Sequence, residues 1–372
     1  MILVIDTKVL KTIDSIGREA LDSLVNDGFF TYGWFKTLET SKLFNLNPFY
    51  VTAYDKGNLV AFAPCFHDVD DQYFRYGQNV IPYMKKVLNV CNRLHIGRDH
   101  VLLCYSPSCY RTKIFVGNGL NEGLLLKNLS EEIDAICKQE KILFSSFLFV
   151  SEFDQLLVTQ LENLGYHKFF WQPTLYLDVR WRNFEDYLKS LDHNVRNRIR
   201  REIRSCKENG VTIEELTEFK HLSKVLSDLS SNNLTKHNKR ETRVYEPSFF
   251  ENLSDYAKGN AKVYVAKKNG AIVGFSLCLK KCGTLDVFHA GFNYVLQEKF
   301  DFTYFNLCYY SPINWAIQEG IQKIYYRVKA ERVKIRRGCK PEKIYSFVKC
   351  HNNIINSQIG AYLKIRNKIG QV

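Results

Sequence analysis

Apolar residues dominate positions 262–279 on both sides of the polar dipeptide Asn269-Gly270. Asn-Gly between two such runs is the strongest short-range signal for a β-hairpin, because a type I′ turn needs positive φ at both central residues. The pattern therefore predicts two antiparallel strands here. Beyond them it predicts a strand at 284–290, a helix at 309–318 and a strand at 323–327.

The same pattern occurs earlier, in residues 50–66. One constant numbering offset aligns four identical pairs: Gly57 with Gly270, Val60 with Val273, Phe62 with Phe275, and Cys65 with Cys278. A shared preference for hairpins explains the glycine and the valine. The phenylalanine and the cysteine in the same register favour duplication of a structural unit, although chance remains the alternative.

The hydrophobic pattern of the first half resembles that of the second. It predicts a helix at 121–138, a strand at 142–150 and further elements up to about residue 170. Residues 67–100 mix aromatic and basic side chains, which is typical of a helix with loops or of a lid that faces a substrate. The length favours two domains, and we place them at residues 1–172 and 173–372.

A strongly amphipathic helix is predicted at 194–207. Its apolar stripe consists of Val195, Ile199, Ile203 and Cys206. Cations cover the rest of the helix: Arg196, Arg198, Arg200, Arg201, Arg204 and Lys207. Packing of the stripe onto the second domain explains this pattern. Binding of RNA to the arginines is the alternative, although aromatic residues do not interleave with them.

Composition narrows the choice of partners. The net charge is +13, which favours an anionic partner such as nucleic acid, a nucleotide, coenzyme A or an acidic lipid surface, unless the protein is simply basic. The 11 cysteines are scattered without zinc-ligand spacing, so we expect buried free thiols in a reducing cytosol and no metal. We expect a cytoplasmic protein, because no signal peptide and no transmembrane segment is evident.

Four stretches together resemble a known family. They are Phe184 to Leu191 with the arginine-rich helix after it, the hairpin around Asn269-Gly270, Tyr309 to Pro312 with its following helix, and the run from Tyr326 to Pro341. In order and spacing the chain resembles the GNAT-like acyltransferases of the FemAB, peptidoglycan-biosynthesis type. The first half, from Trp34 to Pro64, is similar to the N-terminal half of those proteins.

The resemblance implies a mixed α/β fold of two tandem GNAT-like domains, each a mostly antiparallel sheet flanked by helices. The first domain would be a degenerate copy that builds the acceptor groove, and the second would bind the donor and catalyse. The reaction would move an acyl group, from acetyl-CoA or another acyl-CoA, to a small-molecule or peptide-like amine acceptor.

The strand at 284–291 is not followed by the glycine-rich loop that binds a coenzyme A pyrophosphate. FemAB-type proteins also lack this loop and use aminoacyl-tRNA, so an aminoacyl-tRNA donor is the first alternative. A non-catalytic binder of nucleic acid or of a membrane surface, built on the same fold, is the second.

Amide formation needs a base for the amine and an acid for the leaving group. On the predicted strand, His289 or Asp286 is the candidate base. We expect the two on opposite faces, because they are an odd number of residues apart. Tyr310 is the candidate acid. The alternatives are structural hydrogen bonding for His289 and Asp286, and packing for Tyr310.

The densest cationic stretch of the second half is the predicted site for donor phosphates. Its members are Lys329, Lys334, Arg336 and Arg337, followed by Gly338. A solvated basic loop is the alternative. Substrate contacts are expected from Tyr309, Asn306 and Arg327.

Overall fold

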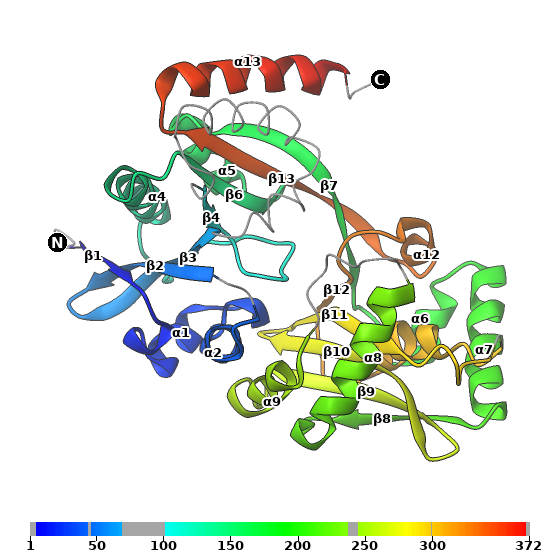
Figure 1. Ribbon diagram of the computed structural model, residues 1–372. Coiled ribbons are helices and arrows are strands. Elements are labelled where there is room, and N and C mark those ends of the chain that lie inside the picture. Colours follow the sequence, from blue (N-terminus) through cyan, green and yellow to red (C-terminus); the bar gives the residue numbers. More distant parts are fainter. Residues whose placement is uncertain (1–4, 44–45, 69–100, 237–244, 299, 370–372) are drawn as a thin grey trace. The chain divides into compact units, whose positions relative to one another are not determined.

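The computed structural model describes residues 5–43, 46–68, 101–236, 245–298 and 300–369. The predicted aromatic and basic segment at 67–100 lies outside the described residues, except for its first two positions. The described residues form two compact units, each a twisted sheet flanked by helices (Figure 1).

The two units do not follow the chain in simple order. Unit 1 comprises Met1–Val25, Phe44–Pro173 and Glu342–Val372, and unit 2 comprises Asn26–Leu43 and Thr174–Pro341. One division between the units falls at Pro173–Thr174, next to the predicted boundary between 1–172 and 173–372, and the segments Asn26–Leu43 and Glu342–Val372 each join the unit formed mainly by the other half; the domain assignment stays a prediction. Asn26–Leu43 adds helix α2 to unit 2, and the segment from Glu342 onward adds most of strand β13 to the sheet of unit 1.

Unit 1 has one sheet in the order β1-β2-β3-β4-β6-β13, with β5 paired to β3. Only the β4–β6 pair is parallel among the pairs named here. Its elements are β1 (Ile5–Leu10), α1 (Arg18–Leu24), β2 (Leu46–Asp55), β3 (Asn58–Asp68), β4 (Val101–Cys104), β5 (Phe115–Val116), α4 (Glu122–Gln139), β6 (Phe144–Ser151), α5 (Gln155–Asn163), the first part of β7 (His167–Asp178), most of β13 (Lys340–Cys350), and α13 (Asn353–Ile369).

Unit 2 has its sheet in the order β7-β12-β11-β10-β9-β8, and here only β11–β12 is parallel. Besides the end of β7, its elements are α2 (Tyr32–Ser41), α6 (Phe184–Lys189), α7 (His193–Glu208), β8 (Val211–Leu216), α8 (Ser223–Lys236), α9 (Pro247–Tyr256), β9 (Ala261–Lys268), β10 (Ala271–Lys281), β11 (Thr284–Phe292), α10 (Thr303–Phe305), the π-helical segment Asn306–Tyr310, α11 (Ser311–Gln318), β12 (Lys323–Tyr325) and α12 (Glu331–Ile335).

The hairpins β2–β3 and β9–β10 have the same construction. Lys56-Gly57 and Asn269-Gly270 both turn through two positive φ angles, as a type I′ turn requires. Each hairpin then carries a bulge, which leaves Val60 in the first and Val273 in the second without a paired residue. The aligned valines thus occupy the same irregular position in both hairpins. Because bulges are retained within families, this match supports two copies of one unit.

Helix α7 forms as its sequence pattern predicts. Ile199 and Cys206 are in the core of unit 2, and Val195 and Ile203 pack against that core. Most of the cations of α7 are exposed. Packing therefore explains the apolar stripe of this helix.

The helix predicted at 309–318 begins earlier than expected. It starts at Thr303, passes through the π-helical turns Asn306–Tyr310 and continues as α11. Pro312 has no N–H for the carbonyl four residues before it, and the wide turn directly ahead of the proline accommodates its ring. Tyr309 and Tyr310 consequently lie inside the helix rather than ahead of it.

Two further observations concern the whole of the described chain. Its cysteines are free thiols, and all except Cys282 are buried. Among these residues, no helix combines the length and the hydropathy that crossing a membrane would need.

Candidate functional site

A bulge in β11 decides which way its two candidate bases face. Leu279 pairs with Asp286 and Leu277 pairs with His289, and the register skips Phe288. Paired residues share a face and alternate residues of one strand do too, so Asp286 and His289 lie on the same face of the sheet. The expectation that they face opposite sides is wrong, because the extra residue in the bulge restores the alternation.

The side chain of His289 contacts residues on and next to the helices of unit 2. Its Nε2 lies 2.7 Å from Oγ of Ser230, which is fully buried on α8. The ring of Tyr245, just before α9, lies 4.3 Å from the imidazole between centroids, and Phe275 of β10 contacts it from another side. The imidazole therefore has a fixed orientation. Asp286 is almost completely buried on the same face.

Strands β11 and β12 diverge next to these residues. They pair only from Thr284 to Asp286 on β11, and β12 ends at Tyr325. The guanidinium of Arg327 then donates a hydrogen bond to the carbonyl oxygen of Phe288, the bulged residue. Arg327 thus links the two strands where they separate, and both partners are positions at which the regular backbone is interrupted.

The segment after β12 is strained. Arg327, Lys329 and Ala330 all have positive φ, between 52° and 67°. Such angles cost energy for residues other than glycine and persist only where the surroundings impose them; they are common at functional sites. We call residues 327–330 the left-handed loop.

Lys334 imposes this conformation. Its Nζ donates to the carbonyl oxygens of Tyr326, Arg327 and Val328, at 2.6, 3.2 and 3.1 Å. An ammonium has three N–H donors, so these bonds use all of them. The side chain is buried, and burial lowers its pKa to about 8. The predicted phosphate contact from Lys334 would require breaking this arrangement.

Arg337 is also buried and internally engaged. Its Nη2 lies 3.0 Å from Oε2 of Glu202 and 2.9 Å from Oη of Tyr310. The Tyr310 hydroxyl donates to the same carboxylate oxygen, and its burial raises the phenol pKa, so that it stays protonated. The three side chains form a closed group, the Glu202–Tyr310–Arg337 cluster.

Sequence reasoning missed Glu202. The signal was present, because Glu202 lies three residues after Ile199 and four before Cys206, within the apolar stripe of α7. An acid on the buried face of a helix implies a buried cationic partner. That partner is Arg337, which we had assigned to the donor phosphates.

The predicted catalytic residues are not brought together as one group. Tyr310 belongs to the core that also contains Val287, whereas His289 lies on the other face of β11. Tyr309 stacks on Tyr326, and Asn306 donates to backbone carbonyls of Glu202 and Phe302. Gly338 has a φ of 86° beside the cluster, while Lys329 and Arg336 are exposed. The roles assigned to these residues stay predictions.

The chain is similar to a crystal structure of FemX, with 13% identity and a TM-score of 0.64 over 95% of this chain and 100% of that one. It is also similar to the C-terminal domain of a putative lysylphosphatidylglycerol synthetase from Agrobacterium fabrum, with 13% identity and a TM-score of 0.59 over 94% of this chain and 97% of that one. The TM-scores show a shared fold, and at these low identities the similarity shows the fold alone.

The two units have the two-domain GNAT-like fold. Residues 12–371 match the FemAB-like family, described as peptidoglycan biosynthesis/recognition. The chain therefore belongs to the FemAB-like family. No curated protein matches it.

Proposed function

We propose that the protein transfers an amino acid from an aminoacyl-tRNA to an amine of a peptide-like cell-envelope precursor. Membership of the FemAB-like family, over nearly the whole chain, supports acyl or aminoacyl transfer in peptidoglycan biosynthesis. The choice of donor rests on one observation, the buried carboxylate of Asp301. The alternative donor, acyl-CoA, was the first expectation from sequence.

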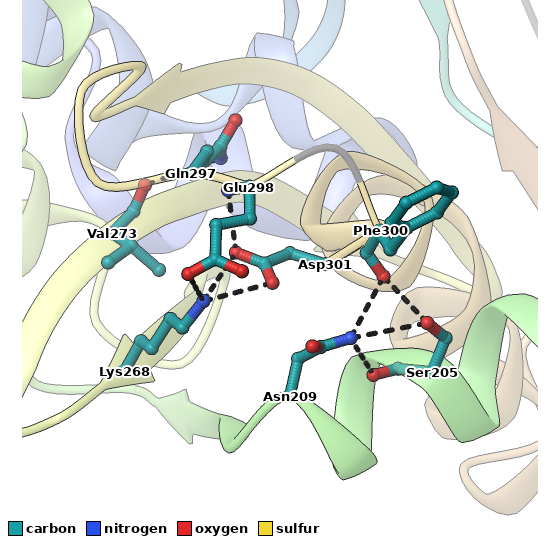
Figure 2. Close-up of polar contacts among 8 residues, drawn as sticks. All are labelled: Ser205, Asn209, Lys268, Val273, Gln297, Glu298, Phe300 and Asp301. Carbon is teal, nitrogen blue, oxygen red and sulfur yellow. Dashed lines mark hydrogen bonds and ion pairs between the residues drawn. The ribbon is translucent and has the colours of Figure 1, made fainter.

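Asp301 lies where a coenzyme A pyrophosphate would need positive charge. In GNAT enzymes the pyrophosphate is held by backbone N–H groups at the start of the helix after the central strand. Here that helical segment starts at Thr303, and Asp301 is 1% exposed just before it. Both of its carboxylate oxygens lie 3.1 Å from Nζ of Lys268, and one accepts from the backbone N–H of Glu298 (Figure 2).

Asp301 thus lies two residues before the helical segment, and its carboxylate neutralises the nearby lysine. Residues 293–302 contain no glycine that would let a backbone approach phosphates closely. A pyrophosphate at this point would meet a buried negative charge, which disfavours binding. This supports the aminoacyl-tRNA donor.

In the proposed reaction the acceptor amine attacks the carbonyl carbon of the aminoacyl ester. A C–N bond forms, the ester C–O bond breaks, and the ribose oxygen leaves with a proton. His289 would accept the proton of the amine, since imidazole is the side chain most often used as a general base. Ser230 would orient the imidazole through the 2.7 Å hydrogen bond and is a positioning residue.

The test measures transfer of a radiolabelled amino acid from bulk aminoacyl-tRNA to a muramyl pentapeptide, beside an assay with labelled acetyl-CoA. We expect transfer from the tRNA only. His289→Gln should lower the rate by about 10²- to 10⁴-fold, the usual contribution of a general base. Ser230→Ala should lower it less and shift its pH profile. His221→Gln, at an exposed position of unit 2, is the matched control.

Two results would reject parts of this proposal separately. Transfer from acetyl-CoA, without transfer from tRNA, would reject the donor. An unchanged rate in a folded His289→Gln variant would reject the base.

A further inference from the structure

The loop between β11 and α10 exposes apolar side chains to solvent. Val295 is 92% exposed, Phe300 60% and Leu296 45%. Exposing three large apolar side chains in one short loop does not stabilise the fold. Clustered apolar exposure of this kind marks an interaction surface.

This loop is held in place by polar contacts at its base (Figure 2). The carbonyl oxygen of Phe300 accepts from Oγ of Ser205 at 2.8 Å and from Nδ2 of Asn209 at 3.3 Å, both on α7. Lys268 fixes Glu298 and Asp301. These contacts anchor Glu298, Phe300 and Asp301 at the base of the exposed apolar side chains without any partner.

The same contacts place the loop beside the cations of α7. Arg201 lies one helical turn before Ser205, and Arg198 about one turn before that, so the three share a side of the helix. Both arginines are exposed, and neither has an ion pair within the described parts of the chain. Glu208 also lies near this side. We call Val295, Leu296 and Phe300, together with Arg198 and Arg201, the loop–helix surface.

We propose that the loop–helix surface docks the protein onto an anionic phospholipid membrane. Arginines attract acidic headgroups, and aliphatic side chains at the tip of a fixed loop gain free energy on entering the interface. An RNA partner fits less well. RNA-binding surfaces place aromatic rings or hydrogen-bonding groups against bases, and here Phe300 is the one aromatic ring of the surface, while Val295 and Leu296 offer neither kind of group. The proposal is independent of the donor and of the catalytic base.

The experiment is co-sedimentation of the full chain with vesicles of phosphatidylcholine alone, or of phosphatidylglycerol and phosphatidylcholine in equal parts. We expect binding to the acidic vesicles only. Arg198→Ser with Arg201→Ser should weaken it by about fivefold for each charge, or about 25-fold together. Val295→Ser with Phe300→Ser should weaken it also, and should leave the remaining binding fully sensitive to salt.

Lys127→Ser with Lys138→Ser, on α4 of unit 1, removes the same charge from an exposed helix elsewhere and should bind like the unchanged protein. Equal weakening by this control would overturn the proposal, because the attraction would then follow net charge alone. The proposal would also be overturned if the protein did not bind acidic vesicles, or if Arg198→Ser with Arg201→Ser weakened only the binding of tRNA. All six positions substituted in these variants are exposed, so they can be changed without opening a core.

Discussion

Removing the charge of Glu202 should destabilise unit 2 severely. Glu202→Gln keeps the shape of the side chain but leaves the guanidinium of Arg337, which is 5% exposed, without a counter-ion. Removing one partner of a buried ion pair lowers the free energy of unfolding by about 3–5 kcal/mol, because the other charge stays uncompensated in the interior. The Gln amide would also present N–H groups or a single neutral acceptor to Tyr310 and Arg337, in place of a carboxylate that accepts from both.

The assay is urea unfolding followed by tryptophan fluorescence, since Trp315 lies in the same core as Tyr310. Glu185→Gln is the matched control. It removes an acid paired with Arg200 on the exposed side of α7, with side-chain exposures of 47% and 43%, and such pairs contribute about 0–1 kcal/mol.

A second variant separates burial of charge from loss of packing. Glu202→Leu with Arg337→Met replaces both charges by apolar side chains, and replacements of this kind are often neutral. We expect the double variant to be more stable than either single one. The reasoning would be refuted if Glu202→Gln cost no more than Glu185→Gln, or if the two single losses simply added.

Three further predictions concern other parts of the chain. Burial lowers the pKa of His351, so the unfolded state takes up its proton first as the pH falls below about 6.5; thermal stability should decline there, and less so in His351→Gln. Gly33→Ala places a Cβ against the backbone carbonyl of Tyr256 and should cost about 1–3 kcal/mol in thermal unfolding, whereas Gly123→Ala on α4, whose Cβ meets only Oδ1 of Asn121 at 3.7 Å, should not destabilise. Lys334→Met removes the side-chain donor from three carbonyl oxygens, of which that of Arg327 still accepts from the backbone N–H of Leu175, and should speed tryptic cleavage of the left-handed loop; an unchanged cleavage rate would show that the loop keeps its conformation without Lys334.

The sequence predicts the local elements of this protein well, because their causes are local. Asn269-Gly270 specifies its turn, and the side chain of Thr31 accepts from the backbone N–H of Trp34 as an N-cap should. The apolar stripe of α7 likewise follows from helical periodicity alone. The two-domain FemAB-type fold also follows, through resemblance.

The site is harder to predict, because its geometry depends on contacts between distant segments. The bulge at Phe288 reverses the expected facing of His289, and nothing in the sequence of β11 alone announces it. Ser230 reaches His289 from a helix 59 positions away. In the sequence, Arg337 belongs to a basic run that is typical of a solvated loop. In the structure it pairs with Glu202, 135 positions away. Charge counts along the chain do not distinguish a buried cation from an exposed one.

The route of the chain through unit 1 has a consequence for its synthesis. Strand β13, which pairs with β6 from Ile344 to Cys350, is translated only after Thr174–Pro341 of unit 2. The edge of β6 that pairs with β13 therefore stays open while the rest of unit 2 is synthesised. An open strand edge is a template for misassociation. The nascent chain should then depend on chaperones for most of its elongation, and stop codons shortly before residue 344 should yield insoluble protein rather than a folded first half.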